Sequence, residues 1–444
     1  MTSCNGGNRG GVTKNLANDA KHINTGGTDW YNSILFDSTT YKYYISGRQK
    51  EPWGLTLISL TLISINPDLT LNYSKYYEVQ DRYDNTLPLV GLTNLWYKDN
   101  STFYVGGWIT LDGIIGEVTK NTGQITLKKI FQDTGALGCI SDKTNIYVVS
   151  YNGHILKLDN NYNIVSSKQV CYSQFRTISI SNNYLITYDL NNNGVVVIDK
   201  NLNDAVRFNN YRRINHAALV DNNNKLYYID RNLGSNNLVL AKVDITNLGS
   251  PSQDIVKEYN WDSIAFSAQM GFSLDENIIL GITTNERPNN IVLLKINKDD
   301  FSIMNQVKLS AQGGRSSELW GNLNIMSLPD GGFVISRSII NSSKSIFGYI
   351  LKSPSDLNIG NNCVFNVTNP NITALASTTY TISTTNLTLN NVTIREIPVT
   401  DYTLVEKNII TFVGCLNSAP NILNNRNGRN NQELDSLTGS SRRR

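Results

Sequence analysis

Histidines are the first residues to consider for chemistry, because imidazole is the side chain best suited to proton transfer near neutral pH. The chain has three of them, His22, His154 and His216. His216 follows Arg212 and Arg213 closely, so it is the candidate for a general base beside an anion-binding group. The simpler interpretation is a hydrogen-bonded structural histidine. The sequence has no HExxH, CxxC, EF-hand, Walker or Asp-box pattern, so it predicts no catalytic residue, no metal site and no cofactor.

Arginine and aromatic side chains form a second candidate site. Arginine suits bidentate recognition of carboxylate, sulfate or phosphate, and arginine with tryptophan or tyrosine is the usual composition of binding hot spots. We expect the loops of one face of the fold to gather them. This predicted ligand-binding face consists of Arg48, Trp53, Trp108, Arg176, Arg212, Arg213, His216, Arg231, Trp261, Arg287, Arg315 and Arg337. The alternative is that the arginines pair with loop carboxylates such as Asp81, Asp230 and Glu318 and only link neighbouring repeats.

Cysteines offer covalent chemistry at one pair of positions. The five cysteines are Cys4, Cys139, Cys171, Cys363 and Cys415, and their spacing fits no metal cluster. Buried free thiols are the default interpretation. Cys363 and Cys415 can form a disulfide if the compartment is oxidising.

Repeated strand patterns must position these side chains. An apolar strand, a polar turn and an aromatic-rich strand recur seven times, at 33–46, 93–106, 137–150, 178–188, 217–230, 271–282 and 325–336. A third strand and a polar hairpin follow each time, so one unit is a four-stranded meander with both faces partly apolar. Such a sheet cannot bury itself, whereas radial stacking covers both faces and protects the edges. Residues 29–362 are therefore predicted to form a β-propeller of about seven blades.

The repeats resemble those of the broad β-propeller superfamily. LYYID at 226–230 is similar to the YWTD type, VTKNTGQI at 118–125 is similar to the quinoprotein type, and the general style is also that of kelch repeats. The resemblance covers about Asp29–Ile359. It implies a fold class and no specific family.

The chain changes character after the repeats. Residues 363–416 are Thr-rich with period-2 alternation, which predicts three to five strands in a small β-sandwich-like module or an appended sheet. Residues 417–444 form a polar tail ending in Arg442–Arg444, and residues 1–28 form a polar N-terminal segment. The composition of the tail is typical of disorder in isolation.

Bulk composition excludes some classes of function. The net charge is +3 with 17% charged residues, which gives no basis for nucleic-acid binding. No apolar run is long enough to span a membrane. The N-terminus lacks the features of a classical signal peptide.

Three functions fit these observations. The first is a non-enzymatic binding or structural propeller, exposed on a virion, phage tail or cell surface, that mediates adhesion by recognising a glycan or protein partner in an assembly. The second is a carbohydrate-active lyase or hydrolase acting on acidic polysaccharide, with His216 and channel arginines at its site. The third is an intracellular scaffold or adaptor. The predicted location is a virion or extracellular surface reached without a classical signal peptide, with the cytoplasm as the alternative.

Overall fold

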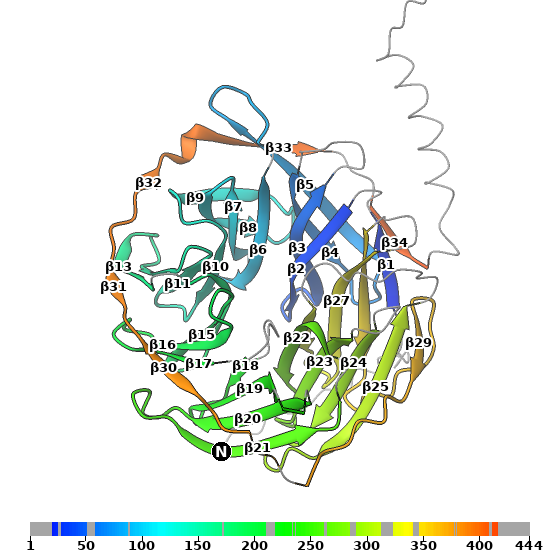
Figure 1. Ribbon diagram of the computed structural model, residues 1–444. Helices are drawn as coiled ribbons and strands as arrows, with labels where there is room; N and C mark the ends of the chain where they lie inside the picture. The colour runs from blue at the N-terminus through cyan, green and yellow to red at the C-terminus, as the bar shows by residue number, and fades with distance from the viewer. Residues whose placement is uncertain are drawn as a thin grey trace, which may run out of the picture.

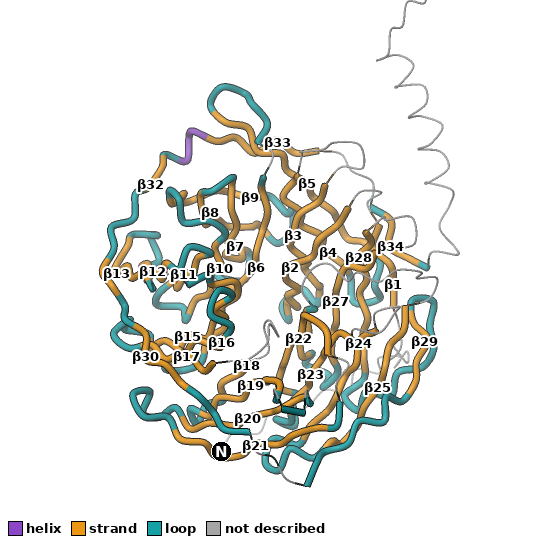
Figure 2. Tube along the Cα trace, in the orientation of Figure 1, coloured by secondary structure: helices purple, strands orange, loops and turns teal. Residues whose placement is uncertain are grey.

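The computed structural model shows seven β-sheets arranged in a ring (Figure 1). It describes residues 20–24, 28–50, 58–87, 89–170, 173–209, 218–232, 234–235, 237–261, 264–284, 290–311, 323–340, 346–376, 378, 380–407 and 411–415. Each sheet is an antiparallel meander that forms one blade, and strand and loop alternate around the ring in Figure 2. The predicted seven-bladed β-propeller is confirmed.

The blades follow one another along the chain. Blade 1 contains β2 (Thr28–Asp37), β3 (Lys42–Lys50), β4 (Ile58–Ile65) and β5 (Leu71–Asp81). Blade 2 contains β6 (Val90–Tyr97), β7 (Thr102–Ile109), β8 (Asp112–Thr119) and β9 (Ile125–Phe131). Blade 3 contains β10 (Leu137–Ser141), β11 (Ile146–Ser150), β12 (His154–Leu158) and β13 (Ile164–Gln169). Blade 4 contains β14 (Phe175–Ile180), β15 (Tyr184–Asp189), β16 (Gly194–Asp199) and β17 (Ala205–Asn209). Blade 5 contains β18 (Ala218–Val220), β19 (Lys225–Arg231), β20 (Leu238–Asp244) and β21 (Ser252–Tyr259). Blade 6 contains β22 (Ile264–Phe272), β23 (Ile278–Thr284), β24 (Asn290–Ile296) and β25 (Ile303–Ala311). Blade 7 contains β26 (Asn324–Ser327), β27 (Phe333–Ile340), β28 (Ile346–Ser353) and β1 (Ala20–Asn24).

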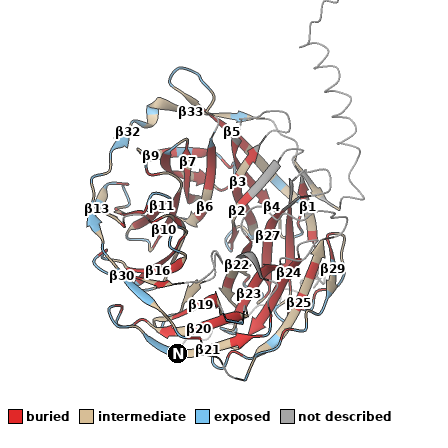
Figure 3. Cartoon of the chain, in the orientation of Figure 1, coloured by how far each residue is buried: buried red, intermediate tan, exposed pale blue. Residues whose placement is uncertain are grey.

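Burial decreases from the middle of each blade to its outer edge (Figure 3). Every residue of β23 and β24 is buried, since both faces of these strands are covered by neighbouring blades. The outer strand β21 has an exposed first half. The hydrophobic core is therefore a series of layers between adjacent blades, and tyrosines such as Tyr44, Tyr147 and Tyr259 are fully buried in it.

A repeated turn closes the ends of the blades. In the turn between the third and fourth strands, one apolar residue adopts a positive φ and inserts into the core. These residues are Leu69 (φ 60°), Tyr162 (φ 66°), Leu202 (φ 60°) and Phe301 (φ 59°), all buried. Leu357 (φ 56°) is buried in the same way in the segment that follows β28, the third strand of blade 7. The left-handed conformation is costly for such side chains, so burial must offset the cost at each turn.

Both ends of the repeat region meet in blade 7. The N-terminal strand β1 pairs antiparallel with β28, with Ala20 opposite Leu351 and Ile23 opposite Gly348. The ring is thus closed by backbone hydrogen bonds between segments far apart in the sequence, a common device for joining the first and last blades of a ring.

The Thr-rich segment forms a belt around the ring. Its elements are β29 (Phe365–Thr368), β30 (Thr384–Leu387), β31 (Asn390–Asn391), β32 (Glu396–Ile397), the 3-10 helix η1 (Val399–Asp401), β33 (Tyr402–Lys407) and β34 (Phe412–Gly414). The strands pair in turn with the outer strands of blades 6, 4, 3, 2, 1 and 7. Between β29 and β30, Ala374 forms an isolated bridge with Tyr259 of blade 5. The belt therefore contacts all seven blades.

The expectation of a separate β-sandwich over 363–416 is corrected by this arrangement. The strands of 365–414 pair with blades and not with one another. Alternation correctly indicated strands with one solvated side, but each strand satisfies its backbone on an outer edge of the ring. An appended sheet, the alternative considered, is closer to what is observed.

Side chains hold the belt at several blades. Gln306 binds both backbone groups of Ile372, with its amide donating to the carbonyl (3.2 Å) and its oxygen accepting from the N–H (2.8 Å). Tyr380 donates to buried Asp230 (2.5 Å). Lys407 forms an ion pair with Glu78 (2.8 Å).

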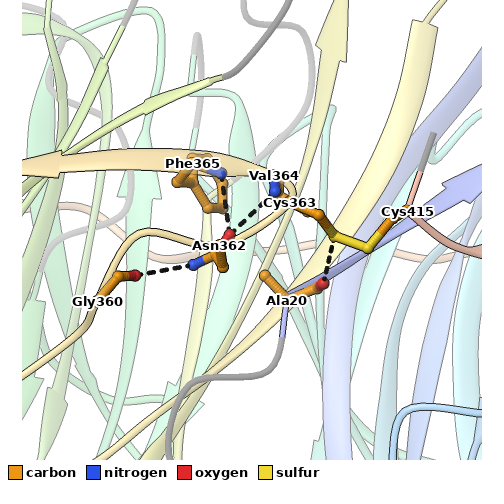
Figure 4. The surroundings of a disulfide bond; sticks show 7 residues. All are labelled: Ala20, Gly360, Asn362, Cys363, Val364, Phe365 and Cys415. Atoms are coloured by element: carbon orange, nitrogen blue, oxygen red, sulfur yellow. Dashed lines mark hydrogen bonds between the residues drawn. A yellow bond between two sulfur atoms is a disulfide. The ribbon is translucent and has the colours of Figure 1, made fainter. Parts of the chain in front are cut away.

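A disulfide joins the two ends of the belt, Cys363 and Cys415, 52 positions apart (Figure 4). Cys363 Sγ lies 3.3 Å from the carbonyl oxygen of Ala20, the first residue of β1. The covalent loop from 363 to 415 thus surrounds the ring and closes beside the strand that completes blade 7.

Blades 1 and 2 share a buried ion pair. Lys120 Nζ lies 3.1 Å from Asp37 Oδ1, both side chains are almost fully buried, and the ammonium lies 4.6 Å from the ring centroid of Phe103. Burial opposes ionisation of Asp37, but hydrogen bonds from Thr40, Thr39 and Lys120 outweigh it and hold the pKa of this carboxyl below its usual value.

Replacing Lys120 with methionine is expected to destabilise the fold by about 3–5 kcal/mol, because the carboxylate of Asp37 would remain buried without its counter-ion. Urea unfolding near neutral pH measures the loss. Lys143→Met, at an exposed turn lysine of blade 3, is the matched control and should change stability by less than about 0.5 kcal/mol. Equal stability of the two variants would contradict this role for the ion pair.

The ion pair between Lys120 and Asp37 should also make the stability of the fold depend on pH. A lowered folded-state pKa means that Asp37 stabilises the fold above its ordinary pKa of about 4 and loses this contribution as the pH falls through the lowered value.

Removing the disulfide, as in Cys363→Ser with Cys415→Ser, is expected to cost about 4 kcal/mol, since it returns the loop entropy of a segment of this length to the unfolded chain. Urea unfolding of the wild type with and without reductant should show the same loss. The double variant should not respond to reductant. A reductant effect in the double variant would assign the change to another part of the molecule.

Candidate functional site

One end of the blades carries the blade-to-blade connections and the turns between second and third strands. We call this end the connection face. Four large apolar side chains are exposed here on blades 1 to 3: Tyr83 (69%), Leu89 (50%), Leu111 (67%) and Tyr151 (38%). We call these four residues the apolar patch. Large exposed apolar side chains that gather on one face typically mark an interaction site.

Backbone hydrogen bonds hold the loops of the patch together. Thr110 N–H donates to Leu89 O (2.5 Å), and Gly135 N–H donates to Leu111 O (2.7 Å). Tyr151 N–H donates to Ala136 O (2.9 Å). The bonds run from the loop before β6 through the β7–β8 turn and the β9–β10 connection to the β11–β12 turn. These loops are thus tied to one another, which lowers the entropic cost of binding through the patch.

Two arginine–aromatic pairs lie at the patch, and one of them includes the patch residue Tyr83. The guanidinium of Arg48 lies 5.5 Å from the ring centroid of Trp108, which joins blade 1 to blade 2. Arg82 lies 4.9 Å from the ring centroid of Tyr83, in the turn that follows β5. Both pairs have the geometry of cation–π contacts.

The indole ring of Trp108 packs against the backbone at Gly91. A Cβ at Gly91 would lie 2.2 Å from Cη2 of the Trp108 ring, so the absence of a side chain at Gly91 lets the indole pack on the β6 backbone. This contact sets the position of the ring that faces Arg48.

The structure shows where half of the residues of the predicted ligand-binding face lie. Arg48, Trp108 and Arg231 lie at the connection-face ends of second strands, and Arg48 and Trp108 are brought together. The backbone of Arg176 lies in β14, the first strand of blade 4. Other predicted members lie outside the described residues: Trp53, Arg212, Arg213, His216, Arg287 and Arg315.

Two predicted members have buried side chains, which corrects the expectation that they are presented on a face. Trp261 is 8% exposed and packs in the core between blades 5 and 6. Arg337 is 2% exposed in the middle of β27. Sequence position located the correct end of the blade for Trp261, but packing turns the indole inward.

Sequence reasoning missed three of the four residues of the apolar patch, Tyr83, Leu89 and Leu111. Leu89 directly precedes the apolar strand β6, and Leu111 lies in the two-residue turn between β7 and β8, so neither sequence pattern shows that the side chain is exposed. Tyr83 follows Asp81, which accepts hydrogen bonds from the N–H groups of Tyr83 (2.8 Å) and Asn85 (2.9 Å) and shapes the turn. The D-x-Y-x-N spacing was the available signal for this turn.

Ion pairs gather at the opposite end of the blades. Lys200 pairs with Asp142 (3.4 Å) between blades 4 and 3, and Lys225 pairs with Asp244 (2.8 Å) within blade 5. The idea that charges link neighbouring repeats therefore applies to lysines at this end.

His154 is the one histidine whose side chain the structure describes. Its side chain is buried, its backbone N–H donates to Ser150 Oγ (2.9 Å), and burial lowers the pKa of its imidazole. Within the described residues, no three His, Cys, Asp or Glu side chains are grouped as metal ligands. That part of the chain also contains no helix long and apolar enough to cross a membrane.

The sheet topology defines the class of this protein as a seven-bladed β-propeller with an outer belt. No protein-family model matches the sequence, and no curated protein matches it. Among solved structures, the chain is similar to the crystal structure of BamB from Moraxella catarrhalis. The identity is 9%, the TM-score is 0.41, and the match covers 72% of this chain and 85% of that chain.

Placing a methyl group at Gly91 tests how the Trp108 ring is seated. In Gly91→Ala the new Cβ would overlap the indole, so the ring must move away from its position against Arg48. A change in tryptophan fluorescence with little loss of secondary structure by circular dichroism is expected. Gly271→Ala is the matched control, because its Cβ would lie 3.8 Å from its nearest neighbour. An unchanged emission spectrum in Gly91→Ala would contradict this packing.

Proposed function

We propose that this protein is a non-enzymatic binding propeller that attaches to a protein partner through the connection face of blades 1 to 3. The observation that carries the proposal is the apolar patch, together with the two arginine–aromatic pairs at it. Tyrosine, tryptophan and arginine are the residues most enriched at the centres of protein interfaces. The hydrogen-bonded loops support the same proposal, because an ordered surface loses less entropy on binding.

The setting we propose is an exposed part of a virion, phage tail or other surface assembly. Its support is the belt and its disulfide, because structural disulfides persist in oxidising compartments. Both cysteines are partly exposed, so a reducing cytoplasm would give thiols access to the bond. This favours the extracellular location over the cytoplasmic scaffold.

Recognition of an acidic glycan is the second candidate, and the pair of Arg48 and Trp108 favours it. A guanidinium binds carboxylate or sulfate groups, and an indole face can stack on the apolar side of a sugar ring. The carbohydrate-active enzyme depends on His216 and neighbouring arginines, which lie outside the described residues, and no described group supports it.

Photo-crosslinking tests the protein-binding proposal. A photo-reactive residue in place of Leu111 should cross-link to one defined neighbour within the native assembly. The same residue in place of Leu274, which is equally exposed (62%) at the opposite end of blade 6, should not. Cross-links of the same kind from both positions would mean that the patch has no special role.

Binding measurements in solution show how much the apolar patch contributes to affinity. With the cross-linked neighbour, Leu111→Ser plus Tyr151→Ser should weaken binding at least about 30-fold, the effect of losing one hot-spot contact of about 2 kcal/mol. Leu274→Ser should not change it. An array of acidic glycans tests the second candidate, and binding there that depends on Arg48 would replace the protein partner by a glycan.

A further inference from the structure

Arg337 is a buried cation without a counter-ion among the described residues. Its side chain is 2% exposed in β27, and its Nε and Nη1 atoms are inaccessible and have no hydrogen-bond partner. Within the described part of the chain it also forms no ion pair. Its condition contrasts with that of Lys120, the other fully buried basic side chain discussed above, which is paired with Asp37.

Tyr349 lies in the apolar layer between blades 6 and 7, which we call the seam. Tyr349 is directly opposite Arg337 in the β27–β28 pair, is fully buried, and its Oη also has no hydrogen-bond partner. Apolar side chains pack in the same layer, among them Ile279 and Ile291 of blade 6 and Ile335 of blade 7. Three polar atoms without a hydrogen-bond partner, Arg337 Nε and Nη1 and Tyr349 Oη, thus lie beside these apolar side chains.

The charge of Arg337 persists at neutral pH. Burial lowers the pKa of its guanidinium to about 10, and the nearby phenol of Tyr349 opposes this shift. A cation that stays charged in an apolar layer costs several kcal/mol unless an anion or strong acceptor meets it. The seam therefore favours occupation by a negative group.

The site lies close to the connection face. The innermost strand β26 pairs with β27 as far as Asn324 opposite Ser336, and Arg337 is one residue beyond this last pair. Leu323, the residue before β26, is also fully buried in this layer.

We propose that Arg337 and Tyr349 form a binding site for a small carboxylate in the seam between blades 6 and 7. A single negative charge neutralises the guanidinium, whereas a dianion would leave a net charge in the apolar layer. Carboxylate oxygens are planar acceptors that match the N–H groups of arginine and a phenolic O–H. The carboxylate belongs to a free metabolite or to the side chain of a partner. This site is independent of the apolar patch.

Thermal unfolding of the full-length protein at constant ionic strength tests the site, with acetate as the probe. The midpoint of the wild type should rise with acetate concentration, as expected for a ligand that binds the folded state, and the midpoint of Arg337→Met should not respond. Arg48→Met, which removes an arginine at the connection-face end of β3, is the matched control and should keep the wild-type response.

Tyr349→Phe keeps the ring and removes the hydroxyl, so it should fold and respond more weakly to acetate even if Arg337→Met does not fold. Chloride and sulfate are the comparison anions, and an equal response to either would overturn the carboxylate assignment. No response of the wild type to acetate would overturn the proposal and mean that the chain neutralises Arg337 itself. A free monocarboxylate that binds the isolated protein tightly would identify a metabolite, whereas a peptide acid from a cross-linked neighbour would identify a partner.

Discussion

The structure depends on one constraint: a four-stranded sheet with two apolar faces needs a neighbour on each face. The middle strands β23 and β24 are buried at every position, which no isolated sheet or two-layer stack of seven equal units can achieve. A closed ring gives every blade two neighbours. In this ring blade 7 is built from both ends of the repeat region, because β1 pairs with β28.

The belt follows from what the ring leaves unsatisfied. Each outer strand presents a row of backbone groups to solvent, and such edges pair with any extended segment that reaches them. The short strands β29 to β34 occupy parts of these edges, and polar or ionic contacts such as Tyr380–Asp230 and Lys407–Glu78 hold them. Because the Cys363–Cys415 disulfide closes beside Ala20, the bond stabilises the same blade that completes the ring.

The propeller separates the roles of its basic residues by position. Lys120 pairs inside the blade 1–2 interface, Arg48 lies over Trp108 at the connection face, and Arg337 is buried among apolar side chains. Lys120 contributes to the stability of the fold, and Arg48 belongs to a surface suited to recognition. Arg337 favours the binding of a negatively charged group. Residue type alone does not distinguish these roles, since each depends on what the adjacent blade places opposite.

Local sequence by itself determined the strands, the turns and the number of repeats. Alternating apolar residues and Asp/Asn turns are short-range signals, and seven similar units with two apolar faces imply a ring. The same alternation indicated strands in the Thr-rich segment but not their partners, because the pairing places Thr385 opposite Arg207 and Thr403 opposite Gln80, positions far apart in the chain. Exposure of Leu111 and burial of Trp261 and Arg337 were also decided by the tertiary structure, since burial depends on the neighbouring blade, which no local pattern specifies.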